Sequence, residues 1–128
     1  MPRIEHVALW THDLERARGF YERFLGAHAG VRYENAATGF ASYFLSLEDG
    51  ARLELMQLPG IAAGAAPEQR TGWVHVAISL GSEERVDALT AELAREGHRV
   101  LDGPRRTGDG YYESVVLDPD GNRLELTV

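Results

Sequence analysis

The sequence Asp-Pro-Asp-Gly-Asn-Arg-Leu-Glu-Leu at residues 118–126 joins a tight turn to a strand with one apolar side. Pro119 presets φ at the second turn position, and Gly121 accepts the positive φ that closes the turn. Polar and apolar residues then alternate, which is typical of a strand with one packed and one open face. We therefore expect Glu125 at a fixed distance from the turn, pointing away from the apolar side. That apolar side consists of Leu124, Leu126 and Val128.

The same combination occurs earlier in the chain and indicates an internal repeat. Residues 50–55 (Gly-Ala-Arg-Leu-Glu-Leu) match residues 121–126 (Gly-Asn-Arg-Leu-Glu-Leu) at five of six positions, 71 residues apart. The tripeptide His-Val-Ala also occurs twice, beginning at His6 and again at His75. Self-similarity at one spacing is typical of two copies of one supersecondary unit.

The composition is that of an ordinary globular protein of one domain's length. The chain has 128 residues, of which 44% are hydrophobic and 26% are charged. The net charge is −7, and no basic cluster is longer than Arg105-Arg106. We therefore do not expect the protein to bind nucleic acid. No apolar run approaches the roughly 20 residues of a membrane helix, and residues 1–5 lack the apolar core of a signal peptide. We expect a cytoplasmic protein with no membrane partner.

The predicted element order is β-α-β-β-β, repeated once. Residues 59–72 are rich in Ala, Gly and Pro without periodicity, and we expect them to form a flexible linker. The sequence thus predicts a first module at 1–58 and a second at 73–128, together one structural domain. The expected strands are 4–10, 30–35, 40–47 and 52–57, then 73–80, 98–101, 111–117 and 123–128. The expected helices begin at caps near Asp13 and Ser82 and end at Gly26 and Gly97.

Each predicted module carries two metal-capable side chains opposite its apolar face: His6 and Glu54 in the first, His75 and Glu125 in the second. A register slip of one residue would bury these groups under the helix. If the two modules pair about a pseudo-twofold axis, the four side chains can converge on one point. The chain has no cysteine, so any metal must be held by imidazole and carboxylate groups. Such a set suits Ni, Zn, Co or Mn and leaves one or two positions for water or substrate.

Each of these residues also has an ordinary structural explanation. A single histidine on a strand is more often structural than a ligand. Glu54 could pair with Arg52, which lies two residues before it on the same strand face. Glu125 has the same relation to Arg123, and such exposed pairs are common and weak. The joint occurrence at repeat-equivalent positions is what favours a metal site.

The other histidines and the aromatic residues carry weaker signals. We expect the remaining histidines at the surface or in local structure, since they have no repeat-equivalent partners: His12, His28 and His98. Most of the prominent aromatic residues are expected in the core or lining the sheet, with one or two walling a substrate pocket: Trp10, Trp73, Tyr43, Phe44, Tyr111 and Tyr112.

Three features together resemble the vicinal oxygen chelate superfamily. They are the duplicated βαβββ plan, the opening segments at residues 4–9 (Ile-Glu-His-Val-Ala-Leu) and 13–21 (Asp-Leu-Glu-Arg-Ala-Arg-Gly-Phe-Tyr), and the closing segment 118–126. That superfamily includes glyoxalase I, bleomycin-resistance proteins, fosfomycin-modifying enzymes, extradiol dioxygenases and methylmalonyl-CoA epimerase. The resemblance covers nearly the whole chain. It implies an α+β fold in which the two modules form a curved, partly closed mixed β-sheet with helices on its outer face.

Within the superfamily, the His-Glu-His-Glu set is similar to that of bacterial glyoxalase I. Extradiol dioxygenases and fosfomycin enzymes typically use two His and one Glu, and epimerases typically have Gln at the position of Glu54. Glyoxalase I commonly has an Arg four residues after the first His, where it contacts the glutathione carboxylate. Here that residue is Trp10, which cannot form a bidentate pair with a carboxylate. A glutathione adduct, another thiol adduct and a different α-hydroxycarbonyl compound all remain open as substrates.

The resemblance implies a metal-dependent glyoxalase-like lyase or isomerase that acts on a small carbonyl compound through an enediolate. One divalent ion per site is expected, with Ni or Zn favoured and Co or Mn as alternatives. Glu125, or else Glu54, would shuttle the proton as general base and acid. Relatives of this length usually form homodimers, with each metal site either within one chain or shared by two. The rival hypothesis is a non-catalytic binding protein of the bleomycin-resistance kind, which the net charge of −7 and the two Trp residues suit.

Overall fold

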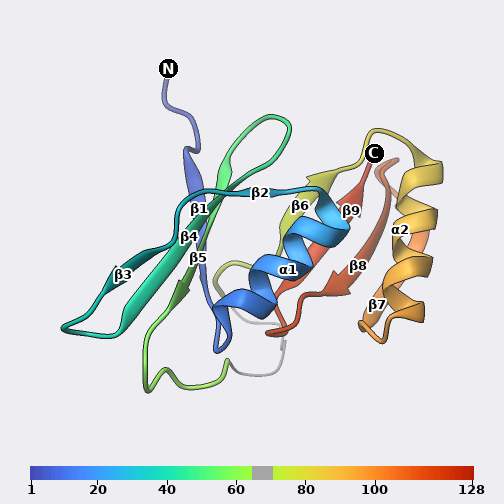
Figure 1. The fold of residues 1–128 in the computed structure, drawn as a ribbon. Coiled ribbons are helices and arrows are strands. Elements are labelled where there is room, and N and C mark those ends of the chain that lie inside the picture. Colours follow the sequence, from blue (N-terminus) through green and yellow to red (C-terminus); the bar gives the residue numbers. More distant parts are fainter. Residues whose placement is uncertain (65–70) are drawn as a thin grey trace. The chain divides into compact units, whose positions relative to one another are not determined.

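A computed structural model describes residues 1–64 and 71–128. The chain divides into two compact units, Met1–Gly64 and Ala65–Val128, each with one helix and one sheet (Figure 1). The predicted linker at 59–72 includes residues 65–70, which lie outside the described residues, so the module boundaries stay a prediction. No helix in the described ranges is both long enough and apolar enough to cross a membrane.

The first unit has one helix packed against a five-stranded sheet. Its sheet order is β1-β5-β4-β2, with β3 also paired to β4; β1 runs parallel to β5 and the other pairs are antiparallel. The expected strand at 30–35 is reduced to β3, and a short strand that was not predicted, β2, precedes it; both pair with β4. The elements are β1 (His6–Trp10), α1 (Leu14–Leu25), β2 (His28–Ala29), β3 (Tyr33–Asn35), β4 (Phe40–Ser46) and β5 (Arg52–Gln57).

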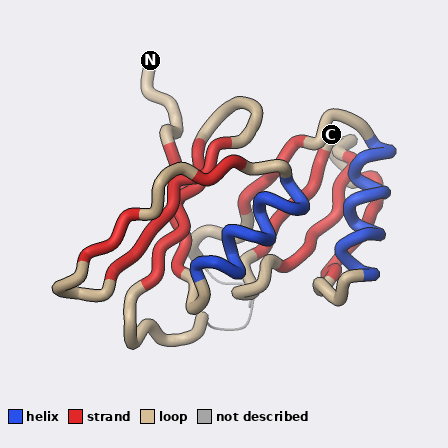
Figure 2. Tube along the Cα trace, viewed as in Figure 1, coloured by secondary structure: helices blue, strands red, loops and turns tan. Residues whose placement is uncertain are grey.

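The second unit repeats this plan, as the secondary-structure colouring in Figure 2 makes plain. Its sheet order is β6-β9-β8-β7, with β6 parallel to β9 and the other pairs antiparallel. The expected strand at 98–101 continues to Arg106, past Gly103 and Pro104, two residue types that usually interrupt strands. The elements are β6 (Val76–Ser79), α2 (Glu83–Arg95), β7 (Val100–Arg106), β8 (Tyr112–Leu117) and β9 (Arg123–Thr127).

The core of each unit lies between its helix and its sheet. We call the side of each sheet that carries the helix the helix side, and the opposite side the far side. Alternate residues of β4, β5, β8 and β9 supply most of the buried helix-side set, as predicted, except that Val128 lies beyond β9 and is exposed. This arrangement of two helices and two mixed sheets confirms the predicted α+β class. The buried helix-side residues include Ala41, Tyr43, Leu45, Leu53 and Leu55 in the first unit, and Ser114, Val116, Leu124 and Leu126 in the second.

The turns and helix ends form where local sequence signals predict them. The Asp118 carboxylate accepts hydrogen bonds from the backbone N–H of Asp120 at 2.9 Å and of Asn122 at 2.8 Å, which fixes the turn before β9. Asp13 caps α1 by accepting from the Arg16 N–H at 3.0 Å, and Gly26 ends this helix with a left-handed φ of 65°.

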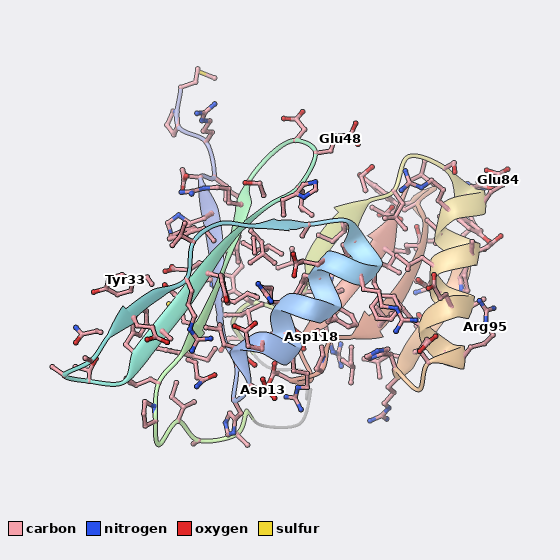
Figure 3. The ribbon with its side chains drawn as sticks, viewed as in Figure 1. Asp13, Tyr33, Glu48, Glu84, Arg95 and Asp118 are labelled. Carbon is pink, nitrogen blue, oxygen red and sulfur yellow. The ribbon has the colours of Figure 1, made fainter. Side chains whose placement is uncertain are left out.

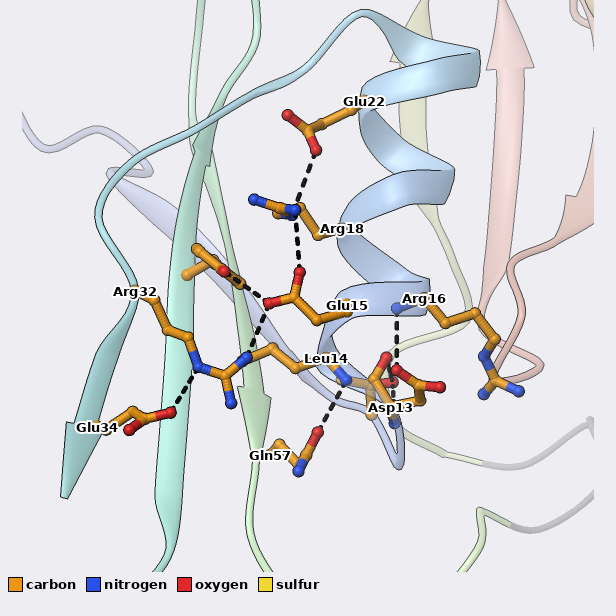
Figure 4. Close-up of polar contacts among 11 residues, drawn as sticks. Asp13, Leu14, Glu15, Arg16, Arg18, Glu22, Arg32, Glu34 and Gln57 are labelled. Atoms are coloured by element: carbon orange, nitrogen blue, oxygen red, sulfur yellow. Dashed lines mark hydrogen bonds and ion pairs between the residues drawn. The ribbon is translucent and has the colours of Figure 1, made fainter. Parts of the chain in front are cut away.

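Two polar contacts fasten α1 to its sheet (Figure 4). The backbone N–H of Leu14 donates to the side-chain oxygen of Gln57 on β5 at 2.8 Å. The buried Tyr43 hydroxyl on β4 donates to the carboxylate of Glu15 at 2.7 Å, and Arg32 donates to the same oxygen at 2.8 Å. The hydrogen bond from Tyr43, followed by that from Arg32, lowers the pKa of Glu15 below its ordinary value of 4.5.

This contact predicts that Tyr43→Phe destabilises the protein in a pH-dependent way. We expect the free energy of unfolding to fall by about 1 kcal/mol at pH 7, because a partly buried hydrogen bond is lost. Since the pKa of Glu15 is lowered in the folded state, this stabilisation is fully present above pH 4.5 and is lost as the pH falls through the folded-state value. Urea unfolding of parent and variant across this range measures the difference.

The exposed Tyr33 offers a matched control, since Tyr33→Phe makes the same chemical change without a Glu15 contact. We expect it to leave stability unchanged at both ends of the pH range. A Tyr43→Phe effect of equal size at neutral and strongly acidic pH would contradict a bond to the ionised carboxylate.

Candidate metal centre

The first pair of candidate ligands lies on the far side of the first sheet. In the parallel register, His6 of β1 is opposite Arg52 and Ala8 is opposite Glu54, so His6 and Glu54 are diagonal neighbours on one face. The Nε2 atom of His6 lies 3.8 Å from the Oε1 atom of Glu54. The His6 side chain is 40% exposed and that of Glu54 is 16% exposed, so both remain open to a ligand.

The second pair repeats this geometry in the second unit. His75 stands two residues before Ala77, and Ala77 is opposite Glu125 in the parallel register of β6 and β9. The Nε2 atom of His75 lies 3.1 Å from the Oε2 atom of Glu125, with side-chain exposures of 30% and 17%. The structure thus brings each predicted histidine to its predicted glutamate. Each of the two other histidines that lie before the linker, His12 and His28, is exposed, as expected.

Both pairs have the chemistry of metal ligands, and one of them also has the spacing. Imidazole nitrogens and carboxylate oxygens bind Zn at about 2.0–2.2 Å, so neighbouring ligand atoms on one ion lie about 3–3.5 Å apart. The His75–Glu125 separation falls in this range, and the His6–Glu54 separation is slightly longer. Across residues 1–64 and 71–128, no group of three or more His, Asp or Glu side chains gathers as a metal site. Each unit by itself therefore offers two candidate ligands, fewer than the three or four that a zinc site takes from the protein.

A neighbouring carboxylate that the sequence pattern did not single out orients the first pair. Glu5 contacts the Nδ1 atom of His6 and accepts from the Nε atom of Arg52 at 2.9 Å. Hydrogen bonds from His6 and then Arg52 lower the pKa of Glu5. With Nδ1 donating to Glu5, the Nε2 atom of His6 keeps its lone pair for a metal, the arrangement usual for histidine ligands. The alternative pairing of Glu54 with Arg52 is wrong, since Arg52 bonds Glu5 and stacks at 4.3 Å on the Phe44 ring.

A second unpredicted carboxylate, Glu113 of β8, lies beside Glu125. Glu113 is opposite Thr127 and Val115 is opposite Glu125, which puts the two glutamates on the same far side. The hydrogen bond with Glu125, then burial, raises the pKa of Glu113. The position equivalent to Glu113 in the first unit is Ser42, which is opposite Met56 as Glu113 is opposite Thr127. The 71-residue offset of the repeat could have revealed this difference, since it aligns these two positions.

Aromatic side chains border the first pair. The Phe44 ring meets the His6 ring edge-on, with centroids 5.2 Å apart. Trp10, on the same strand face as His6, meets Phe40 edge-on at 6.3 Å. Of the aromatic residues noted in the sequence, Phe44 and Trp10 thus lie on the far side, whereas Tyr43 is buried under α1.

Comparison with known proteins places this arrangement in a family. The model of the Glyoxalase/Bleomycin resistance protein/Dioxygenase superfamily matches residues 3–126. The protein YqjT of Bacillus subtilis is 30% identical over 96% of this chain and 96% of its own length. A lactoylglutathione lyase of Haemophilus influenzae is also 30% identical, over 97% of this chain and 90% of its own. A solved domain from Frankia sp. EAN1pec, titled glyoxylase/bleomycin resistance protein/dioxygenase, superposes with a TM-score of 0.84 at 23% identity, covering 100% of this chain and 98% of that one.

Other relatives are named as enzymes that catalyse different classes of reaction. They include a methylmalonyl-CoA epimerase of Bos taurus at 27% identity and the glutathione transferase FosA of Serratia marcescens at 26%. Membership is therefore shown by the whole-chain match, while the reaction is not fixed by it. The chain belongs to the glyoxalase/bleomycin resistance protein/dioxygenase superfamily.

Proposed function

We propose that this protein is a metal-dependent glyoxalase-like lyase or isomerase acting on a small carbonyl substrate through an enediolate. The observation that carries the proposal is the repeated His–Glu pair, at repeat-equivalent positions in both units, with His6 in β1 and His75 one residue before β6. A purely binding relative would be expected to have lost some of these side chains, whereas both His–Glu pairs are intact. The 30% identity to a lactoylglutathione lyase supports this reading.

The proposed metal site combines His6 and Glu54 with His75 and Glu125. Two imidazoles and two carboxylates favour Ni or Zn, with Co and Mn as further possibilities. When bound, such an ion supplies Lewis-acid polarisation of the substrate's vicinal oxygens. The four ligands come either from one chain or from the two chains of a homodimer.

Proton transfer between the adjacent substrate carbons is assigned to a glutamate. We place Glu125 in this role as general base and then acid, with Glu54 as the alternative. The two glutamates have different surroundings, because Glu113 hydrogen bonds to Glu125 whereas Ser42 occupies the equivalent position near Glu54. This difference supports unequal roles for the two carboxylates.

The first prediction from the proposed function is that protein purified without chelator and reconstituted with Ni or Zn binds about one ion per four-ligand site. His6→Ala and Glu125→Ala should each weaken metal affinity by more than about 100-fold, since even outer-shell changes cost 10–100-fold. Elemental analysis and chelator competition measure this. The exposed His28→Ala is the matched control and should bind as the parent does. Protein that takes up no tight metal would instead favour a non-catalytic binding role.

The second prediction concerns the proton. Glu125→Gln keeps an oxygen that can coordinate but removes the proton acceptor, so turnover should fall by about two to four orders of magnitude. Turnover of an α-hydroxycarbonyl thiol adduct in deuterated water should place deuterium at the accepting carbon. We expect a smaller loss in Glu54→Gln. A loss confined to Glu54→Gln would reverse the assignment, and full activity in both metal-loaded variants would end it.

The third prediction distinguishes sites shared between chains from sites within one chain. We expect a dimer by light scattering, and His6→Ala and His75→Ala homodimers that each lack tight metal. If sites are shared, refolding the two variants together should restore one intact site in each mixed dimer, since the unmutated histidines come from different chains. Sites within one chain predict no recovery, because every chain then carries one defective site. A monomer with metal bound would contradict sharing.

A further inference from the structure

Three aromatic side chains form a partly open patch on the far side of the first sheet. We call Trp10, Phe40 and Tyr33 the aromatic platform. The Phe40 ring is central, with its centroid 6.3 Å from that of Trp10 and 6.0 Å from that of Tyr33. Trp10 remains 45% exposed and Tyr33 remains 56% exposed, so both rings offer surface to a ligand. Figure 3 labels Tyr33 on β3.

The strand register places the platform on the same face as the metal ligands of the first unit. Tyr33 is opposite Ser42, two residues from Phe40 along β4, and the intervening Ala41 is buried on the helix side. Trp10 is opposite Met56, two residues beyond Glu54 on β5. The platform therefore continues the surface that begins at His6 and Glu54.

The spacing suits a small molecule that reaches both features. On β1, only Ala8 separates His6 from Trp10 on this face, and Ala8 is directly opposite Glu54. Two residues along a strand span about 6.6 Å, so Trp10 lies about 6.6 Å along the sheet from the level of Ala8 and Glu54, and about 13 Å from His6. Ala8 has only a methyl side chain, so no bulky side chain of β1 stands between His6 and Trp10 on this face. A ring joined through one or two atoms to oxygens held beside Glu54 would thus reach Trp10.

The aromatic platform favours an aromatic ring as the part of the ligand that lies beyond its oxygens. Aromatic rings bind other rings in offset or edge-on arrangements, each contributing beyond the area buried. Trp10 provides such a surface, and its neutral indole cannot form the bidentate pair that an Arg forms with a carboxylate. A bulky protein partner seated on this continuous surface would also cover His6 and Glu54, whereas a small molecule would use both regions together.

We propose that the substrate is a carbonyl compound bearing an aromatic group, with its ring on the aromatic platform and its vicinal oxygens at the His6–Glu54 pair. This inference rests on the proposed function, because the oxygens need the metal site. It goes further by naming the substrate class and the residues that select it.

Two metal-chelating probes test the inference: acetohydroxamate and benzohydroxamate, which share vicinal oxygens but differ by a phenyl ring. On Zn-loaded protein, titration calorimetry should show benzohydroxamate binding about tenfold more tightly, the preference expected for one buried ring contact. Trp10→Ala should remove most of that preference, and Trp10→Phe should restore part of it. Tyr33→Ala, at a more exposed position, should reduce the preference if Trp10→Ala does not fold.

The chain's second tryptophan provides the matched control. Trp73 is fully exposed and lies in the other unit, so Trp73→Phe should keep the full preference. This variant also leaves Trp10 as the one tryptophan, and its fluorescence should be quenched by benzohydroxamate more than by acetohydroxamate.

The outcomes separate the two proposals. Equal binding of both probes by the parent, or a preference that survives Trp10→Ala and Tyr33→Ala, would overturn the aromatic platform and leave the proposed metal function standing. Protein that takes up no Zn and binds neither probe would overturn the proposed function and this inference together.

Discussion

The parallel register between the first and last strand of each unit is the constraint on which the site depends. Residues alternate between the two sides of a strand, so burying Leu53 and Leu55 beneath α1 forces Glu54 to the far side. The same register puts His6 on that side, one diagonal step from Glu54. Slipping the pairing by one residue would bury a charged carboxylate in the core, which is costly without a partner. Core packing thereby also positions the candidate ligands.

Duplication gives the two units the same His–Glu pair but different surroundings. In the second unit, Glu113 adds a carboxyl group next to Glu125, and its raised pKa reflects that hydrogen bond and its burial. In the first unit, the equivalent strand carries Ser42, flanked on the same face by Phe40 and Phe44. One surface is thus acidic and the other aromatic. Under the proposed function, such divergence around a repeated His–Glu pair would let one half of the protein serve proton transfer while the other selects the substrate.

The strands that carry the His6–Glu54 pair also depend on how α1 is held against the sheet. Glu15 bonds the Tyr43 hydroxyl on the helix side of β4, while the next residue, Phe44, contacts His6 on the far side. Adjacent residues of one strand therefore serve the core and the candidate site. Polar contacts under the helix fix the strand that supports the first ligand pair.

Local sequence by itself determined the turns, the helix caps and the alternation of β5 and β9. Each of these follows from chemistry within a few residues, as in the turn at Asp118 and the cap at Asp13. The repeat further identified which His and Glu fall on equivalent strand positions. Only the tertiary structure decided which side chains meet across strands, because lateral register joins residues far apart in the chain. It brought Glu113 to Glu125, turned Arg52 toward Glu5 rather than Glu54, carried β7 past Gly103, and gathered Tyr33 and Phe40 beside Trp10.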